Sequence, residues 1–414
     1  MLNSKSEFRK LLAASFISQS GSHFLTIALS AFILMHSKSV VLASLVFVFS
    51  FLPSVLVSPK LGHWVDNKVS RWLIARNELI SIVATILCGL CIYLDLPVGV
   101  LCVILGFRSI LLFIGRAAAI KWLKLITQPE IQAGRIKLFY LAFFLSTAVS
   151  GILAAQALNH LSIWTVVIID SISYLGGLSL YLSLKQIKVQ ESSQQNGQFG
   201  IGNAPTLVET LTTIFSLPAL RTSFLVVCLS QAIFQGAYSV LVSYLPIKHF
   251  NVGASGLGWF QIAASIGITV GFLVNWFAPK FLSERVTNFP FRAMVASFFA
   301  MCALVLCVNA SSVISSLIPF LVLNLAYECI WLHHNSEFFR GSPIHHAARY
   351  QFTLAAVAAF VMAITTLAYS FAIESLGLFQ GVLLIMITSV IIAAACFSLS
   401  ARPATALVRN EGRS

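Results

Sequence analysis

Two oppositely charged side chains lie inside long apolar stretches of this sequence, Arg108 and Asp170. A charge near the centre of a bilayer costs about 2.5–3.5 kcal/mol on insertion scales, so such residues usually pair or mark a pathway for ions or ligands. The two are expected at similar depth, and Ser173 and Tyr174 extend a polar strip from Asp170. They can form a structural pair; alternatively, Arg108 binds an anionic group in a cavity and Asp170 carries protons.

Glu328 is the only acid inside an apolar stretch of the C-terminal half. Asn324 and Trp331 stand at i−4 and i+3, so a helix would place the three side chains on one polar and aromatic face. Glu328 is the best candidate for a group that takes up and releases protons. The alternative is a gate residue near the cytoplasmic end, paired with a loop arginine.

Uncharged and weakly basic side chains form two further candidate groups. His23 follows Gln19 by one helical turn, and it either titrates near neutral pH or serves as a hydrogen-bonded structural histidine. Gln231, Gln235 and Tyr238 fall at i, i+4 and i+7, which predicts a shared helix face that lines a cavity. Hydrogen bonding between packed helices is the alternative for this face.

Other chemistry finds little support in the residue pattern. His333-His334 and His345-His346 lack the HxxxH spacing of a helical metal site, and a solvated loop without metal is expected there. The cysteines lie in apolar stretches, which favours packing over redox or zinc chemistry. The sequence has no Walker A motif and no persuasive set of nucleophile and base. We therefore expect no enzyme activity and no cofactor.

The composition indicates that these residues sit in a membrane. Of the 414 residues, 58% are hydrophobic and 9% are charged, and mean hydropathy is +0.91. A soluble domain carries about 25% charged residues, because its surface faces water. The net charge of +13 would suggest nucleic acid as a partner, but the basic residues recur between apolar stretches instead of gathering on one face. Nucleic-acid binding is therefore not expected.

Hydropathy predicts an all-α fold with twelve transmembrane helices. The predicted spans are residues 11–35, 39–59, 72–94, 98–119, 135–158, 161–184, 219–246, 255–278, 291–309, 312–332, 350–372 and 375–399. With the N-terminus inside, every Lys and Arg of the 26 falls in or beside a cytoplasmic segment except Lys38, Lys248 and Arg108. This asymmetry follows the positive-inside rule and places both termini in the cytoplasm of a multi-pass protein of the cell membrane.

The polar segment 189–205 divides the predicted helices into two sets of six. Its Gln, Ser, Gly and Asn residues cannot bury a core, so a flexible cytoplasmic connection is expected. The predicted organisation is an N-terminal six-helix bundle over residues 1–188, a linker over 189–217 and a C-terminal bundle over 218–414. Such a division is typical of transporters that rock two bundles around a central site.

The segment from Gly62 to Arg71, expected between the second and third helices, carries a motif. Gly62, Asp66 and Arg71 match GxLaDrxGrk, motif A of the major facilitator superfamily, whereas Asn67 and Val69 depart from it. The chain thus resembles this superfamily. The resemblance implies a gate formed by the motif, in which the carboxylate faces an arginine on the fourth helix. The corresponding arginine in this chain is Arg116.

Further segments resemble the macrolide-efflux and enterobactin-exporter group. They are Phe8-Arg9-Lys10-Leu11-Leu12, Ser18-Gln19-Ser20-Gly21, Leu52-Pro53, Gln128-Pro129-Glu130 and Ile169-Asp170-Ser171-Ile172-Ser173-Tyr174. The resemblance implies a monomeric, proton-coupled antiporter that exports a small amphipathic molecule such as a drug or a siderophore. The helix-5 motif gxxxGPxxGG of proton antiporters survives only as Ser146-Thr147-Ala148-Val149-Ser150-Gly151. An importer, a facilitator or a lipid flippase of the same fold is therefore the alternative.

Overall fold

The computed structural model describes residues 4–68, 70–160, 162–185, 207–277, 301–342 and 347–400, and these residues are almost entirely helical. The helices of the N-terminal half are α1 (Ser4–Ser37), α2 (Val40–Lys68), α3 (Arg71–Tyr93), α4 (Val98–Ile126), α5 (Pro129–His160) and α6 (Ile163–Leu182). Those of the C-terminal half are α7 (Leu207–Ser216), α8 (Pro218–Ser230), η1 (Gln231–Gln235), α9 (Gly236–Tyr244), η2 (Leu245–His249), α10 (Gly253–Phe277), α13 (Val313–Gly341), α14 (Ala347–Leu376) and α15 (Leu378–Ser400). Within these ranges, ten helices are long and apolar enough to cross a membrane.

Most predicted spans coincide with a described helix, but the helices run further than the apolar stretches. The stretch 291–309 is described only from residue 301, and residues 301–308 are helical. α1 begins seven residues earlier than predicted, α2 and α4 end later, and α13 continues to Gly341. All of these extensions lie at the ends expected in the cytoplasm. Hydropathy misses them because they are rich in polar and basic residues, which favour helix in water as well.

Two segments differ from the sequence-based expectation. The segment that carries Gly62 and Asp66 was expected in a loop, but it is the last part of α2, and Arg71 is the first residue of α3. His333 and His334 were expected in a solvated loop, but they lie within α13, where the ring of His334 is buried. His345 and His346 fall outside the described residues. Helix α7 occupies part of the interval 189–217 that was predicted to be a linker.

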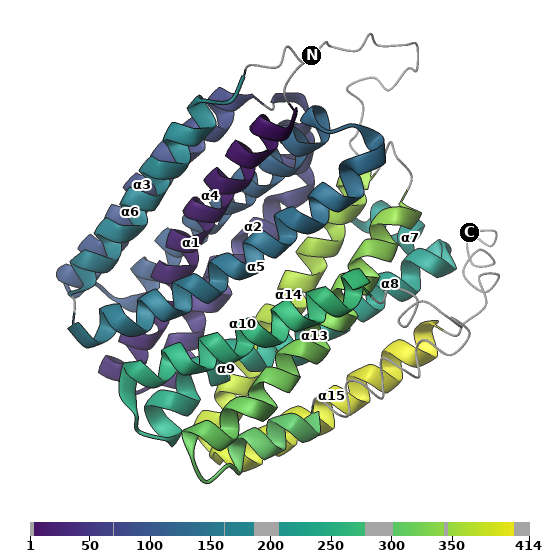
Figure 1. Cartoon of the computed structure of the whole chain (residues 1–414). Helices are drawn as coiled ribbons and strands as arrows, with labels where there is room; N and C mark the ends of the chain where they lie inside the picture. The colour runs from purple at the N-terminus through teal and green to yellow at the C-terminus, as the bar shows by residue number, and fades with distance from the viewer. Residues whose placement is uncertain are drawn as a thin grey trace.

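The two halves of the chain lie side by side and meet along two pairs of helices (Figure 1). In the N-terminal half, α1 packs on α5 and α6, and α3 and α4 complete the bundle; in the C-terminal half, α10 packs on α13 and α14 on α15. Between the halves, α2 packs along α14 and α5 along α10. The structure therefore consists of two helical bundles with a seam that runs between them.

The tightest helix pair, α10 and α13, depends on two glycines spaced as in a GxxxG motif. A methyl group on Gly267 would overlap the backbone of α13 at Leu321, and one on Gly271 would overlap Glu328. Small residues at this spacing let membrane helices approach each other closely. The pair thereby fixes the position of the carboxyl group of Glu328.

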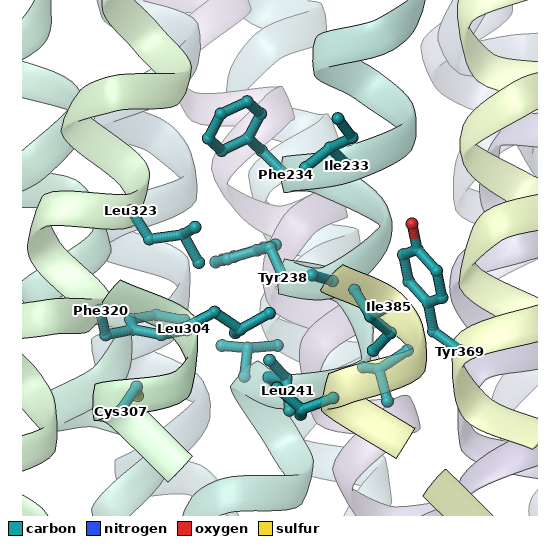
Figure 2. Packing of buried hydrophobic residues seen from close by; sticks show 14 of the residues in the cluster. Ile233, Phe234, Tyr238, Leu241, Leu304, Cys307, Phe320, Leu323, Tyr369 and Ile385 are labelled. Atoms are coloured by element: carbon teal, nitrogen blue, oxygen red, sulfur yellow. The ribbon is translucent and has the colours of Figure 1, made fainter. Parts of the chain in front are cut away.

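A hydrophobic cluster fills the C-terminal bundle and reaches across the seam. Figure 2 shows Phe234 and Tyr238 facing Phe320 and Leu323 of α13. Leu34, Val40, Ala43 and Phe47 of the N-terminal half belong to the same cluster. The π-helical segment η1 precedes Tyr238 and changes the angular step between successive side chains. The side chains of Gln231, Gln235 and Tyr238, predicted to share one face of a regular α-helix, therefore point in different directions.

Candidate functional site

Arg108 and Asp170 form a buried ion pair between α4 and α6. Oδ2 of Asp170 also accepts a hydrogen bond from Thr85 Oγ1 of α3 at 2.8 Å, and Nε of Arg108 donates to the same hydroxyl at 3.3 Å. The guanidinium lies 5.7 Å from the ring centroid of Tyr174. The structure thus brings together the two charges that the sequence placed at similar depth, and three helices hold them.

The backbone of α1 approaches this pair closely at Gly21. A methyl group there would overlap Oδ1 of Asp170 and the side chain of Ser173. The next residue, Ser22, forms a hydrogen bond through its hydroxyl with that of Tyr174, which lies one turn after Asp170 on α6, at 2.8 Å. A side chain at position 21 would displace the partners of the ion pair, which explains why a residue without Cβ stands there.

Glu78 on α3 is a buried acid that the sequence analysis did not single out. Its carboxyl group is 3% exposed and accepts a hydrogen bond from Ser18 Oγ of α1 at 2.8 Å. It lies in the predicted span 72–94, so the criterion that identified Asp170, an acid within an apolar stretch, also applies to it.

Arg116 lies within the N-terminal bundle, ten residues before the end of α4. Its guanidinium is centred 4.0 Å from the ring centroid of Phe143, and its buried Nε has no hydrogen-bond partner among the described residues. Two small cavities, each of about 10 Å³, touch Arg116, Gln19 and Phe139. Each is large enough for about one water molecule. Glu78 lines the first cavity.

His23 on α1 lies beside Phe143, the ring that Arg116 also contacts. Its ring contacts Phe143 edge to face with centroids 5.0 Å apart. The buried Nε2 has no hydrogen-bond partner among the described residues, so the expectation of a fully hydrogen-bonded histidine is not met at this atom. Phe143 of α5 thus contacts both His23 of α1 and Arg116 of α4.

Aromatic rings of α5 and α13 contact each other across the seam. Trp331 of α13 contacts Tyr140 and Phe144 of α5, with centroids 5.9 Å and 5.5 Å apart. Tyr327 stacks on Trp331 from within the same helix. The hydroxyl of Tyr140 is hydrogen-bonded to Asn335 across the seam. Trp331 thus belongs to the seam between the bundles.

Glu328 and Asn324 face α10 and not the rings around Trp331. Glu328 is fully buried against Gly271, and neither carboxyl oxygen has a hydrogen-bond partner among the described residues. Asn324 donates to the carbonyl of Phe320 one turn earlier at 2.8 Å. No described arginine pairs with Glu328. The three residues predicted to share a face of α13 therefore contact two different helices: Asn324 and Glu328 contact α10, and Trp331 contacts α5.

The polar face predicted around Gln231 is also divided. Nε2 of Gln231 donates to the hydroxyl of Tyr327 at 2.8 Å, whereas the hydroxyl of Tyr238 donates to Oε1 of Gln261 on α10 at 2.8 Å. Gln235 is half-buried, and its carbonyl accepts from Ser239. These contacts match hydrogen bonding between packed helices, the alternative weighed for this face.

The motif residues are described only in part. The side chain of Asp66 and the surroundings of Gly62 lie outside the described part of the structure. Arg71 Nη1 donates to the carbonyl of Leu184 just after α6, at 3.2 Å, which suits a cation at a helix C-terminus. Arg116 lies among Gln19, Phe139 and Phe143 rather than at the end of α4, so its surroundings are those of a bundle interior.

Polar contacts also join the halves at the end opposite to the chain termini. The Glu374 carboxylate of α14 accepts from the backbone N–H of Val41 at 2.8 Å and from Ser39 Oγ at 3.0 Å. Nearby, the hydroxyls of Ser370 and Ser44 are hydrogen-bonded. Gly151 of α5 lies directly against the side chain of Gln261 of α10. These contacts are not predictable from sequence patterns, because each joins residues far apart in the chain.

Solved structures of membrane transporters share this architecture. A bacterial homologue of the human lysosomal transporter Spinster, in an inward-facing and unoccupied conformation, matches with a TM-score of 0.70 and 12% identity over 99% of each chain. A POT family transporter in complex with a thioalcohol-conjugated peptide matches with a TM-score of 0.72 and 12% identity, over 95% of this chain and 96% of that one. The nucleoside transporter NupG matches with a TM-score of 0.72 and 14% identity, over 96% of this chain and 100% of that one.

Sequence comparison adds no closer relative. No protein-family model matches the chain, and no curated protein has a significantly similar sequence. The identities to the solved structures are low, and the proteins differ in cargo, so the likeness establishes the fold. The chain has the all-α membrane fold of major facilitator transporters.

Proposed function

We propose that this protein is a secondary transporter that exports a small amphipathic organic molecule by alternating access. The moving units would be the bundles of residues 1–188 and 218–414, connected by the interval 189–217. The observation that carries the proposal is the seam, where α2 packs along α14 and α5 along α10. Two bundles with such a seam can rock against each other around a site at the level of the membrane centre.

Contacts across the seam occur toward both of its ends. Toward the end expected outside, Glu374 binds Ser39 and Gly151 lies against Gln261. Toward the cytoplasmic end, Phe113 of α4 contacts Phe352 of α14, with ring centroids 5.2 Å apart. An alternating-access cycle breaks one set while the other holds. The described contacts therefore fit a state between the outward-open and inward-open forms.

The buried polar groups supply the properties that coupled transport needs. Glu328 is fully buried without a hydrogen-bond partner among the described residues, and a charge there is costly unless a proton neutralises it. We therefore assign proton coupling to Glu328. Arg108 and Asp170 form a buried ion pair and serve chiefly to hold α4 and α6 together, while Oδ1 of Asp170 has no hydrogen-bond partner among the described residues. Glu78 is a second buried acid for the same coupling role.

Orientation and location follow from the charge pattern. Most Lys and Arg residues lie at one set of helix ends, the set that includes both termini, so these ends belong in the cytoplasm. The protein would then be a monomeric exporter in the cell membrane that works without a cofactor and has a small organic molecule and protons as its partners. No group with the arrangement of an enzyme's active site is proposed.

A facilitator, importer or lipid flippase of the same fold is the second candidate. The observation that favours it lies in α5, where a proton antiporter has Gly and Pro. In this chain Ser150 Oγ instead donates to the carbonyl of Ser20 on α1, which ties α5 to its neighbour. Accumulation in right-side-out and everted vesicles, with and without a protonophore, separates the candidates. An exporter driven by protons accumulates dye in everted vesicles, and the protonophore abolishes this.

The coupling role of Glu328 is tested by Glu328→Gln, which keeps the shape and removes the acid. In everted vesicles with a panel of fluorescent amphipathic dyes, we expect the variant to lose pH-dependent uptake while remaining folded in the membrane. Glu209→Gln is the matched control, because Glu209 is an exposed acid on α7. Unchanged pH dependence in the folded Glu328→Gln protein would remove the assignment.

A further inference from the structure

Arg116 differs from Arg108 in having no anionic partner among the described residues. Arg108 is paired with Asp170, whereas the guanidinium of Arg116 rests on the ring of Phe143 and its Nε is buried without a hydrogen bond. Glu78 lines the same cavity, but its carboxyl group bonds to Ser18 and is not within the 4.0 Å that defines an ion pair with Arg116. Arg116 as a whole is half-buried, and an anion bound to its guanidinium would compensate the charge in these partly apolar surroundings.

Two small cavities lie beside Arg116, and they mark where a ligand could bind next to its side chain. The two cavities share four lining residues, Ser15, Gln19, Arg116 and Phe139, so the side chain of Arg116 borders both of them. Their volumes of about 10 Å³ admit only water, which means that an organic molecule needs the bundles to separate first. Tyr140, one turn before Phe143 on α5, contacts Trp331 and Asn335 of the other half.

Aromatic rings surround this cation on the side toward the seam. Phe143 contacts both Arg116 and His23, and the next residue, Phe144, reaches Trp331 of the other half. Opening of the seam would expose these ring faces together with the guanidinium. Flat rings offer stacking surfaces, and the planar fork of arginine matches a carboxylate or phosphate with two parallel hydrogen bonds.

We propose that Arg116 and the adjacent rings of Phe143, Phe144 and Trp331 bind an organic anion that carries an aromatic group. The anionic group, a carboxylate, sulfonate or phosphate, binds the guanidinium, and the aromatic group stacks within the ring cluster. This inference rests on the proposed transport function and names the chemical class of the cargo. Gln19 lines both cavities and donates a further hydrogen bond to the bound anion.

The test compares three compounds that share one ring system and differ in charge: naphthoate, naphthamide and naphthylmethylammonium. Their binding to the purified full-length protein in detergent is measured by thermal shift and by isothermal titration. We expect naphthoate to raise the melting temperature and the other two to have little effect. Binding of naphthylmethylammonium or naphthamide as tight as that of naphthoate would overturn the proposal.

Variants locate the site. Arg116→Gln should weaken naphthoate binding about 10- to 100-fold, the range for loss of a charged hydrogen-bond partner. Arg76→Gln is the control, because Arg76 is an exposed arginine of α3. If Arg116→Gln does not fold, Arg116→Lys and Phe143→Leu replace it, and both should weaken naphthoate binding. Retention of full affinity in the folded variants refutes the site.

The outcome is separable from the transport proposal. Spin labels at the outer and inner ends of the bundles report whether the protein exchanges between outward-open and inward-open forms, whatever the ligand. Exchange without any naphthoate binding would refute the anion site and leave alternating access in place. Absence of exchange would instead count against the transporter proposal itself.

Discussion

The ion pair of Arg108 and Asp170 is held by groups from three helices, and its energetics follow from its burial. Both side chains are at most 1% exposed, and Thr85 bonds to both. Removal of one charge leaves the other without compensation in an apolar interior. Removal of both charges leaves only a packing problem. The pair therefore predicts opposite outcomes for single and double substitutions.

We expect Asp170→Asn to destabilise the protein by about 3–5 kcal/mol, because the guanidinium of Arg108 loses its counter-charge. The double variant Arg108→Leu with Asp170→Leu should recover most of this loss. Unfolding by denaturing detergent, followed by circular dichroism, measures both. An Asp170→Asn protein as stable as the wild type would show that the pair does not hold α4 to α6.

At this scale the sequence predicts the burial of Arg108, Asp170 and Glu328, misses that of Glu78, and predicts few of the contacts that these side chains make. Arg108 and Asp170 are predicted to pair because both stand in apolar stretches at similar depth. Arg116 is assigned to a gate only through resemblance to a motif, and that role stays a prediction because the side chain of Asp66 lies outside the described residues. Its contact with Phe143 does not follow from the motif, since motif similarity does not fix the direction of a side chain about its helix. Glu328 is predicted on one face with Trp331, but its side chain packs against Gly271 because α10 approaches α13 closely there.

Helices α5 and α10 form an element pair across the seam whose packing is sensitive to a single methyl group. A Cβ on Gly151 would lie far inside van der Waals distance of Cβ and Cγ of Gln261. The Cβ of Gln261 cannot move without its backbone, and its amide accepts from Tyr238. A side chain at position 151 must therefore push the two helices apart.

Gly151→Ala should cost about 1–3 kcal/mol, the usual range for overpacking a filled interior, and should shift the population toward the outward-open form. Gly134→Ala on the same helix is the matched control, because nothing lies within 4 Å of a Cβ there. Spin labels at the outer ends of α5 and α10 measure the separation. Equal separations in the two variants would contradict the packing described here.

Element boundaries are predictable where a helix is apolar and less so elsewhere. The spans of α3 and α6 are predicted within about two residues, since polar residues flank both apolar stretches. The end of α2 is missed because Lys60, Lys68 and their polar neighbours continue the helix into water. The π-helical segment η1 has no signal in periodicity, and it is the reason that Gln231 and Tyr238 reach different partners.

The arrangement of the whole molecule depends on contacts between the halves. The even number of apolar stretches, the distribution of basic residues and the polar segment 189–205 predict two bundles with both termini on one side. The pairing of α2 with α14 and of α5 with α10 does not follow from these patterns, because it joins residues hundreds of positions apart. Those pairings determine which conformations the molecule can exchange between.

Glu374 forms a contact between the halves that should influence the exchange between outward-open and inward-open forms. Its carboxylate, on the C-terminal half, bonds to the first turn of α2 through Val41 N–H and to Ser39, which itself caps the helix through a bond from Leu42 N–H. A carboxylate at a helix N-terminus satisfies free N–H groups and opposes the positive end of the helix dipole. The contact can exist only while the outer ends of the two halves are together.

Glu374→Ala should therefore favour the outward-open form. The loss of a capping group is worth about 0.5–2 kcal/mol, which corresponds to an about 2- to 30-fold change in the equilibrium between forms. Ser375→Ala is the control, because the hydroxyl of Ser375 bonds only to Phe371 of its own helix. Spin labels at the outer ends of α2 and α14 measure the population. Since Glu374 is exposed, the difference from wild type should shrink as salt is raised, and a salt-independent effect would point to packing rather than charge.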